Sequence, residues 1–333
     1  MKRRNGFTLI EILMVLALMA ILLGVSAGAL TRAVPANQLT TYQIRDAVRR
    51  ARNFAIKEGS PAFVLLEASD EHDLGPTLTT GGQRAVGLWH FEDASLMGYP
   101  GPGLGAGFEL VPVGVIGRGL QLVAEKPSYL DLGHASAFDA TDGVACELFV
   151  KPYSPGARVL LDKGKSYSLT LDNELRPHAH VLLRTEGDVA RDPGKRLEVE
   201  LEEPLPLHRY TRLGMSFDGQ TIELYVDGRL RNHGRLPARK AMLPDPGAAL
   251  MIGKVQEPFA GEIDEVRLAV LVLEHAQRLP NVLRLGRPRT EIRFESSGKL
   301  DRLLHSGPVD IAFQSGDPPK QRALTVDLMG EIR

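Results

Sequence analysis

The sequence predicts an α+β host unit, formed by a long N-terminal helix and a small antiparallel sheet, with an all-β sandwich inserted into it. Three observations predict this architecture. An apolar run near the N-terminus leads into a helical pattern that ends near residue 58. Short alternating segments, typical of strands, occupy residues 291–327. Between these two regions, residues 86–285 consist of short apolar runs separated by Gly, Pro and Asp-Gly turns.

The N-terminus combines a short basic leader with a membrane-length apolar stretch. Lys2, Arg3 and Arg4 precede an apolar run that starts at Ile12 and persists loosely to Leu30. About 20 such residues suffice to span a bilayer as a helix. A cleaved secretory signal, cut after the small residues 25–27, is the alternative. Glu11 argues against that alternative, because a carboxylate at bilayer depth costs about 2.5–3.5 kcal/mol and a disposable signal gains nothing from it.

The segment Gly6-Phe7-Thr8-Leu9-Ile10-Glu11 resembles the cleavage and methylation motif of type IV prepilins and type II secretion pseudopilins. The resemblance implies that a prepilin peptidase cuts after Gly6 and methylates the new amine of Phe7. It also implies a helix that stays in the inner membrane until it is extracted into a filament of pilin or pseudopilin subunits. Glu11 matches the family's carboxylate, which is thought to meet the N-terminal amine of a neighbouring subunit.

Composition restricts the partners and the compartment. Lys and Arg number 40 against 41 Asp and Glu, so no basic excess suggests nucleic acid. The leader's basic charges should stay cytoplasmic, which makes the chain a single-pass inner-membrane protein with everything after Leu30 outside. Cys146 is the single cysteine. The exported part therefore has no internal disulfide and no cysteine-based zinc site.

An amphipathic helix is predicted after a break at Pro35. Its apolar positions recur at three- and four-residue spacings and are Leu39, Ile44, Ala47, Val48, Ala51 and Ala55. Its polar side, rich in arginine, is interpreted as a solvated face. The helix should end near Gly59-Ser60-Pro61, and residues 62–67 are predicted as the first strand.

The C-terminal residues repeat a strand and turn pattern. Strands are predicted at 291–294, 309–313 and 322–327. This order resembles the carboxyl end of H-type minor pseudopilins and related minor type IV pilins. The predicted domains are a leader at 1–6, a helix and first strand at 7–83, an insertion at 84–288, and the C-terminal strands of the host unit at 289–333. The two host segments together have the size of one ordinary domain.

The middle region predicts a two-sheet sandwich. Residues 221–229 alternate cleanly into an Asp227-Gly228 turn, which is a strong hairpin signal. Residues 224–228 and 261–267 resemble the laminin-G/concanavalin A-like jelly roll. Phe149 and Tyr210 stand where that family often has tryptophan, so neither is expected to form a binding platform. First and last strands that lie close together would allow insertion into a surface loop of the host unit.

Glu262 and Asp264 are the candidate catalytic residues, because some glycosidases of this fold carry carboxylates at alternate strand positions. Alternate residues share one face, which Glu265 does not. Retaining hydrolysis needs two carboxyl groups about 5–5.5 Å apart, commonly with a third acid, but the next position on that face is Val266. These acids are therefore predicted to make turn and edge contacts in a sandwich that is not an enzyme.

Other candidate sites are weaker. Gly164-Lys165-Ser166 lacks the glycine that a phosphate loop needs at position 159, and the glycine string of residues 101–107 suggests a flexible loop. His178 and His180 share a strand face without a third ligand, so a structural role is expected. Calcium could bind at rim aspartates, and three of them occupy or border turns, but no cofactor or metal site is assigned. These aspartates are Asp131, Asp218 and Asp227.

The predicted function is that of a minor pseudopilin or pilin that presents a lectin-like sandwich to a glycan, a secreted protein or a surface. Secretion, pilus and DNA-uptake filaments all fit the N-terminal motif. Two alternatives stay open. One is a membrane-anchored lectin or adhesin without a filament, for which the segment from Gly6 to Glu11 would be unnecessary. The other is a tethered glycoside hydrolase, which a third acid beside Glu262 would have favoured.

Overall fold

The computed structural model describes residues 36–69, 74–123, 127–156, 158–185, 194–256, 259–280, 283–302, 304–315 and 320–333. The predicted processing site at Gly6 and Phe7, the carboxylate of Glu11 and the predicted membrane segment lie outside these residues. Among the helices that are described, none is long and apolar enough to cross a bilayer.

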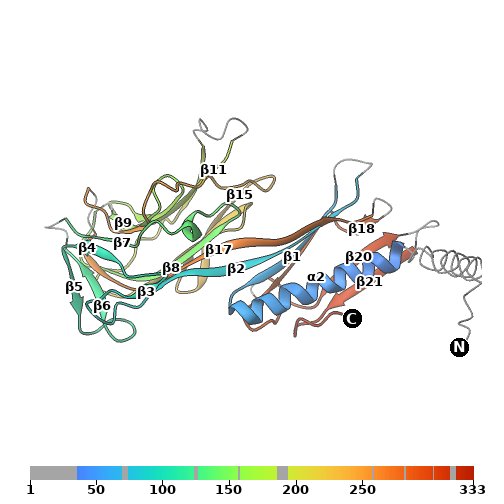
Figure 1. The fold of residues 1–333 in the computed structure, drawn as a ribbon, viewed down its shortest axis with the longest axis horizontal. Helices are drawn as coiled ribbons and strands as arrows, with labels where there is room; N and C mark the ends of the chain where they lie inside the picture. The colour runs from blue at the N-terminus through green and yellow to red at the C-terminus, as the bar shows by residue number, and fades with distance from the viewer. Residues whose placement is uncertain are drawn as a thin grey trace, which may run out of the picture.

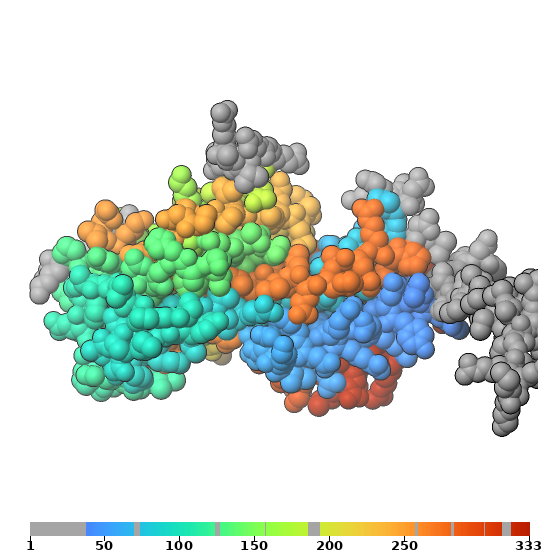
Figure 2. All heavy atoms as spheres, in the orientation of Figure 1, coloured from blue at the N-terminus to red at the C-terminus, as the bar shows by residue number. Residues whose placement is uncertain are grey.

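The described chain forms two lobes along the long axis of the molecule (Figure 1). We call them the helical lobe, built from residues 36–82 and 271–333, and the sandwich lobe, built from the residues between. Figure 2 shows the same division, with the blue N-terminal and red C-terminal segments gathered in one lobe. The helical lobe is therefore made from the two ends of the described chain.

Helix α2 (Ala36–Glu58) confirms the predicted amphipathic helix. Its buried face carries the predicted Ile44, Ala47, Val48, Ala51 and Ala55, together with Phe54. Leu39 was predicted on this face, but it is 45% exposed and Thr40 is buried instead. The reason is geometric, because Leu39 precedes Ile44 by five residues and 3.6 residues make one turn.

The end of α2 follows the predicted stop signal. Gly59 has a φ of +59°, and the Ser60 N–H donates to the Ala55 carbonyl at 3.2 Å. This pattern is the Schellman motif, which satisfies helix carbonyls that would otherwise lack partners. The chain then turns directly into strand β1 (Ala62–Glu67), which has the predicted bounds.

Strand β1 lies between β2 (Thr77–Trp89) and β19 (Arg289–Phe294), and both pairings are antiparallel. The predicted C-terminal strands are confirmed as β19, β20 (Val309–Ser315) and β21 (Lys320–Val326). They do not share one sheet, because β20 and β21 pair with β18 (Arg284–Leu285) apart from β19. Alternate residues of β1 and β19 pack under α2 together with β20, β21 and the start of β2, and the strand residues of this core are Ala62, Val64, Leu66, Leu78, Ile292, Phe294, Ile311, Phe313, Leu324 and Val326.

The sandwich lobe consists of two antiparallel sheets. In the described residues, the larger sheet joins β1, β2 and β19 to eight further strands: β3 (Gly98–Tyr99), β5 (Phe108–Val111), β6 (Gly119–Leu122), β8 (Val144–Pro152), β13 (Thr211–Phe217), β14 (Thr221–Val226), β15 (Arg229–Arg235) and β17 (Gly261–Arg278). The second sheet holds β4 (Leu104–Ala106), β7 (Tyr129–Asp131), β9 (Arg158–Asp162), β10 (Tyr167–Leu171), β11 (Pro177–Leu183), β12 (Lys195–Glu200) and β16 (Met251–Ile252). The 3-10 helix η1 (Ser136–Phe138) lies between β7 and β8.

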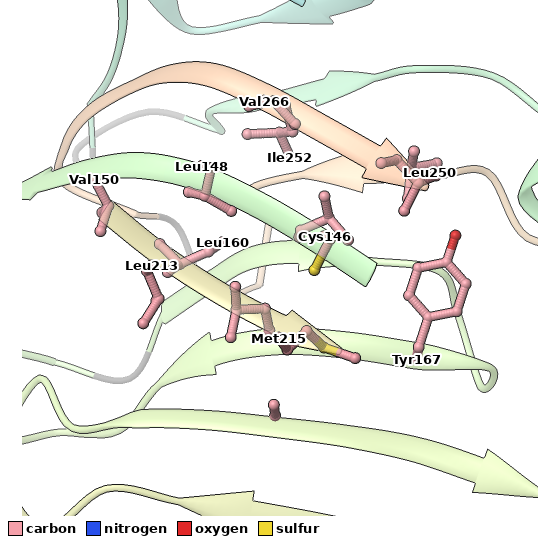
Figure 3. Close-up of a cluster of buried hydrophobic side chains, with 14 of the residues drawn as sticks. Cys146, Leu148, Val150, Leu160, Tyr167, Leu213, Met215, Leu250, Ile252 and Val266 are labelled. Carbon is pink, nitrogen blue, oxygen red and sulfur yellow. The ribbon is translucent and has the colours of Figure 1, made fainter. Parts of the chain in front are cut away.

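The core of the sandwich lobe lies between these sheets (Figure 3). Strand β8 alternates strictly, with Cys146, Leu148 and Val150 facing the core. The only cysteine is thus a buried apolar side chain, and burial raises the pKa of its thiol to about 12.

Two local predictions had different outcomes. The hairpin between β14 and β15 is confirmed, and both turn residues, Asp227 and Gly228, have positive φ as a type I′ turn requires. The glycine string was predicted as a flexible loop, but Leu104–Ala106 forms β4 beside β7. A Cβ at Gly105 would lie 2.1 Å from the Tyr129 carbonyl oxygen, so glycine is what permits this close pairing.

Strands β2 and β17 run without a break from one lobe into the other (Figure 1). They pair antiparallel from Val266 opposite Trp89 to Arg278 opposite Thr77. The first half of β17 also pairs with β8 inside the sandwich. The chain therefore enters and leaves the sandwich lobe on two neighbouring strands, while the predicted limit at residue 84 falls inside β2.

The sandwich lobe also contacts the face of the helical lobe's sheet that lies opposite α2. Phe63, Leu65 and Leu271 form a small apolar cluster there, and the guanidinium of Arg239 lies 5.7 Å from the centre of the Phe63 ring. Arg267 donates to the Ser60 hydroxyl at 2.9 Å. These contacts add side-chain packing to the shared strands at the junction of the lobes.

Candidate functional site

The three predicted acids lie on β17 beside β8. Glu262 pairs in register with Lys151, and Asp264 pairs with Phe149. Ile263, which lies between them, is buried in the core of the sandwich, so Glu262 and Asp264 lie on the outer face of the sheet as predicted. The pKa of the Tyr210 hydroxyl is raised first by burial and then by these two carboxylates. The sequence therefore placed them on the correct face.

The carboxylate of Glu262 is fully engaged. One oxygen accepts from the Tyr153 hydroxyl and from Lys151 Nζ at 3.0 Å, and the other accepts from the Tyr210 hydroxyl. Burial by itself would raise the pKa of Glu262, but the two tyrosines and the lysine outweigh it and the pKa is lowered. Glu262 is therefore a charged anchor for three side chains.

Those three side chains form an outer-face cluster that the sequence did not reveal. Lys151 Nζ lies 5.6 Å from the Tyr153 ring centre and 5.3 Å from that of Tyr210, and the Tyr153 ring stacks on exposed His208. Burial, followed by the bond to Glu262, raises the pKa of Tyr153 to about 12. The one sequence signal for this cluster was the alternation of β8, which places Lys151 on the outer face of the sheet.

Asp264 is covered by the loop that precedes β6. Its Oδ2 accepts from the backbone N–H groups of Val115 at 2.8 Å and Ile116 at 3.2 Å, and its Oδ1 accepts from Glu265 N at 2.9 Å. Burial raises its pKa, although these three N–H groups oppose the rise. A side chain with 0% exposure and both oxygens in use has no open path to a substrate.

Glu265 departs from the strand pattern. Its φ is +52°, and the pairing with β8 shifts register between Asp264 and Arg267. This bulge turns the Glu265 carboxylate toward His90 Nδ1, 2.8 Å away. The three acids thus have three separate sets of partners. Glu262 holds the outer-face cluster, Asp264 holds the loop that precedes β6, and Glu265 contacts His90.

The two histidines do not act together. His178 lies 3.6 Å from a carboxylate oxygen of Asp172 and 3.3 Å from one of Glu200. His180 Nδ1 lies 2.7 Å from the Ser168 hydroxyl, and burial lowers its pKa to about 4. Among the residues that the structure describes, no group of three acids, histidines or cysteines could hold a metal ion.

The three rim aspartates accept hydrogen bonds from backbone N–H groups. Asp131 accepts from Gly133 N at 2.7 Å, Asp218 from Thr221 N at 2.7 Å, and Asp227 from Arg212 N at 3.1 Å. Asp131 and Asp218 therefore cap their own turns, whereas Asp227 joins the turn between β14 and β15 to the neighbouring strand β13.

A buried lysine lies next to the weak phosphate-loop signal. Lys163 has 0% exposure, and its ammonium contacts the carbonyls of Asp245 at 2.8 Å and Ala248 at 2.7 Å. Asp139 completes the site as an ion pair at 2.9 Å. Three donors thus meet three acceptors inside the protein, which the sequence gave no means of predicting.

Two protein families match the chain. The concanavalin A-like lectin/glucanases superfamily matches residues 125–277. The prokaryotic N-terminal methylation motif matches residues 1–27. The first match runs from just before β7 to near the end of β17. No curated protein matches the chain.

Three solved structures are similar to parts of the chain. Domain 4 of AbnA, a GH43 extracellular arabinanase from Geobacillus stearothermophilus in complex with arabinotriose, is 17% identical, with a TM-score of 0.41 over 60% of this chain and 95% of that one. The binding domain of botulinum neurotoxin serotype G is 10% identical, with a TM-score of 0.43 over 56% of this chain and 47% of that one. The CBM40 of the Ruminococcus gnavus IT-sialidase, bound to α2,3-sialyllactose, is 17% identical, with a TM-score of 0.36 over 45% and 88%.

Proposed function

We propose that this chain, which carries a prokaryotic N-terminal methylation motif and a concanavalin A-like sandwich, is a minor pilin or pseudopilin of a type II secretion or type IV pilus-like filament. The observation that carries the proposal is the motif over residues 1–27. In this role, prepilin peptidase cleaves after Gly6, and the N-terminus is anchored in the inner membrane with the folded lobes outside. The sandwich lobe is then displayed to a glycan, a secreted protein or a surface.

The arrangement of the lobes supports display. Helix α2 begins at the end of the molecule that lies farthest from the sandwich lobe, and it ends next to that lobe (Figure 1). A membrane segment that precedes Ala36 therefore joins the protein at the end opposite the sandwich. The sandwich lobe projects away from the membrane and from a filament built on the N-terminal helices.

The filament proposal is tested at Gly6, Phe7 and Glu11. The mature protein should begin with N-methylated Phe7, whereas an N-terminus at Gly28 would identify an ordinary signal and remove the proposal. A Glu11 pair with a neighbour's amine at about 4 Å is worth roughly 4 kcal/mol before desolvation, at an effective dielectric near 20. Glu11→Leu should therefore keep membrane insertion and cleavage but lose crosslinking to neighbouring pilin helices. Unchanged crosslinking would rule out this role.

The helical lobe acts as the host unit in this proposal, and the sandwich as its insertion. Gln83 and Leu271 are opposite one another on β2 and β17, so an Asn-Gly turn replacing residues 84–270 would close a hairpin. Phe63→Thr and Leu65→Thr would make polar the face that the sandwich covers. This shortened protein should unfold cooperatively and still reach the membrane. Degradation of it, beside a stable full-length protein, would contradict the two-unit organisation.

The sandwich lobe is proposed to bind without catalysing hydrolysis. Support comes from Glu262 and Asp264, since both oxygens of each carboxylate already accept hydrogen bonds from the protein. The full-length protein should release no reducing ends from polysaccharides. Turnover that Glu262→Gln abolishes would contradict this and favour a tethered glycoside hydrolase.

A further inference from the structure

A groove of about 480 Å³ opens at one edge of the sandwich lobe. It lies where β12 of one sheet approaches β15 of the other, and the segment between β12 and β13 forms one wall. Asn232 on β15 holds the two edges together by donating to the Glu200 carbonyl at 2.7 Å. The volume falls in the range of about 300–1,000 Å³ typical of small-molecule sites.

The floor of the groove contains an unused polar group. Thr211 is 2% exposed and lines the groove, and its buried hydroxyl has no hydrogen-bond partner among the described residues. Thr211 pairs in register with Val150 and shares the inner face of β13 with Leu213, so its side chain points between the sheets. An unpaired buried hydroxyl destabilises the protein, and a hydrogen bond to a ligand's hydroxyl would remove that cost.

The rim offers free charged groups. In the part of the chain that the structure describes, no hydrogen bond or ion pair engages the side chains of Glu202, Glu203 or Arg231, and all three are exposed. Carboxylates accept hydrogen bonds from hydroxyls, and a guanidinium donates to hydroxyl oxygens. The same walls carry Pro204 and Leu205, which give apolar surface between the polar groups.

We propose that this groove binds a neutral saccharide, with Thr211 on the floor and Glu202, Glu203 and Arg231 on the rim as its hydrogen-bonding groups. The inference rests on the proposed function, for which it names the ligand class and its site. A sugar ring carries hydroxyl groups around its rim and C–H groups on its faces. The groove supplies polar side chains for the hydroxyls and the apolar surface of Pro204 and Leu205 for the C–H groups. The lining holds four carboxylates against two guanidiniums, which disfavours saccharides that carry carboxylates or sulfates.

An extended peptide is the competing occupant, because β15 is an edge strand. The edge carries Arg229, Arg231 and Arg235, and charged side chains on an edge oppose the addition of another strand. Thr211, whose hydroxyl has no partner among the described residues, also lines the groove from β13 and not from the β15 edge. Both observations favour the saccharide.

The test is binding of the full-length protein, in detergent, to an array of neutral and acidic saccharides, followed by titration calorimetry on the strongest neutral ligand. Thr211→Val keeps the shape of the floor and removes the hydroxyl. It should weaken binding about tenfold while leaving the thermal midpoint unchanged or higher. Glu203→Gln should also weaken binding. Glu198→Gln, on β12 outside the groove lining, is the matched control and should bind normally.

Three results would overturn the site: no neutral saccharide binds, acidic saccharides bind better, or Thr211→Val binds as the parent does. Capture of an extended peptide whose affinity depends on β15 would assign the edge to peptides instead. These outcomes are separate from the filament test. If the protein binds a saccharide but is not cleaved after Gly6, the saccharide site stands and the filament proposal fails. If subunits crosslink but no saccharide binds, the filament proposal stands and the saccharide site fails.

Discussion

The guanidinium of Arg293 on β19 lies 3.6 Å from the carboxylate of Asp218, which stands between β13 and β14. This ion pair joins the C-terminal strands to the sandwich lobe. Glu223 of β14 lies 4.0 Å from the same guanidinium, and Glu291 of β19 lies 3.0 Å from it. One arginine thus contacts three acids at the junction, and it shares Glu291 with Arg289. Burial by itself would lower the pKa of Arg293, but these acids outweigh it and the pKa is raised.

Removal of this arginine should destabilise the whole molecule. Arg293→Ala removes the cation beside Asp218 and Glu223 and leaves Glu291 with Arg289, and breaking a buried ion pair costs up to about 3–5 kcal/mol. Chemical denaturation of the protein from residue 36 onward measures this change. Arg196→Ala is the matched control, because its pair with Glu198 is exposed and worth at most about 1 kcal/mol. Equal effects of the two variants would show that Arg293 does not clamp the lobes.

Lys163 provides a second test of buried charge. Lys163→Met keeps the apolar stem but leaves Asp139 and two carbonyls without their partner, so we expect a loss of about 3–5 kcal/mol in the free energy of unfolding. Lys254→Met removes a half-exposed pair with Asp162 and should cost at most about 1 kcal/mol. A Lys163 variant as stable as the parent would mean that the neighbouring segments do not depend on its ammonium.

His180 predicts loss of stability in acid. Its pKa is lowered from 6.5 to about 4, chiefly by burial and then by Arg196. Between these values the unfolded chain binds a proton that the folded chain does not, so stability is lost as pH falls from about 6.5 to about 4. Relative to His180→Gln, the parent should lose at most about 3 kcal/mol over this range. His305, whose pKa is also lowered, is present in both proteins and cancels. Parallel curves would contradict the prediction.

Cys146 offers a direct probe of the sandwich core. The thiolate is the form of cysteine that attacks thiol reagents, and burial raises the pKa of the Cys146 thiol to about 12. The native protein should therefore resist labelling at mildly alkaline pH and should label rapidly in denaturant, as followed by intact mass. Met215→Ala, which opens space beside β8, should speed native labelling. Fast labelling of the parent would place Cys146 outside a closed core.

Local signals predicted most of the fold. Helix α2, strand β1, the three C-terminal strands and the Asp227-Gly228 hairpin each depend on a few consecutive residues, so periodicity and turn chemistry sufficed. The continuity of β2 and β17 was not predicted. It arises from pairing between residues nearly two hundred positions apart, such as Trp89 and Val266, and no local pattern reports such pairing.

In the candidate sites, too, local features were predicted and contacts between distant segments were not. The alternation of β17 placed Glu262 and Asp264 on one face, but their partners come from distant segments. Tyr210 reaches Glu262 across 52 positions, and Val115 reaches Asp264 across 149. The groove over Thr211 needs two sheet edges to meet, which is a property of the packed sandwich. From residue type alone, Thr211 is an ordinary strand residue.

The uninterrupted passage of β2 and β17 between the lobes has a mechanical consequence. A tensile load on the sandwich lobe, against a filament held at the start of α2, runs along the axes of these strands (Figure 1). Hydrogen bonds between antiparallel strands lie perpendicular to those axes. The two backbones therefore carry the load side by side, and the bonds between β2 and β1 are loaded in shear, many at once, so that this tether does not unzip bond by bond.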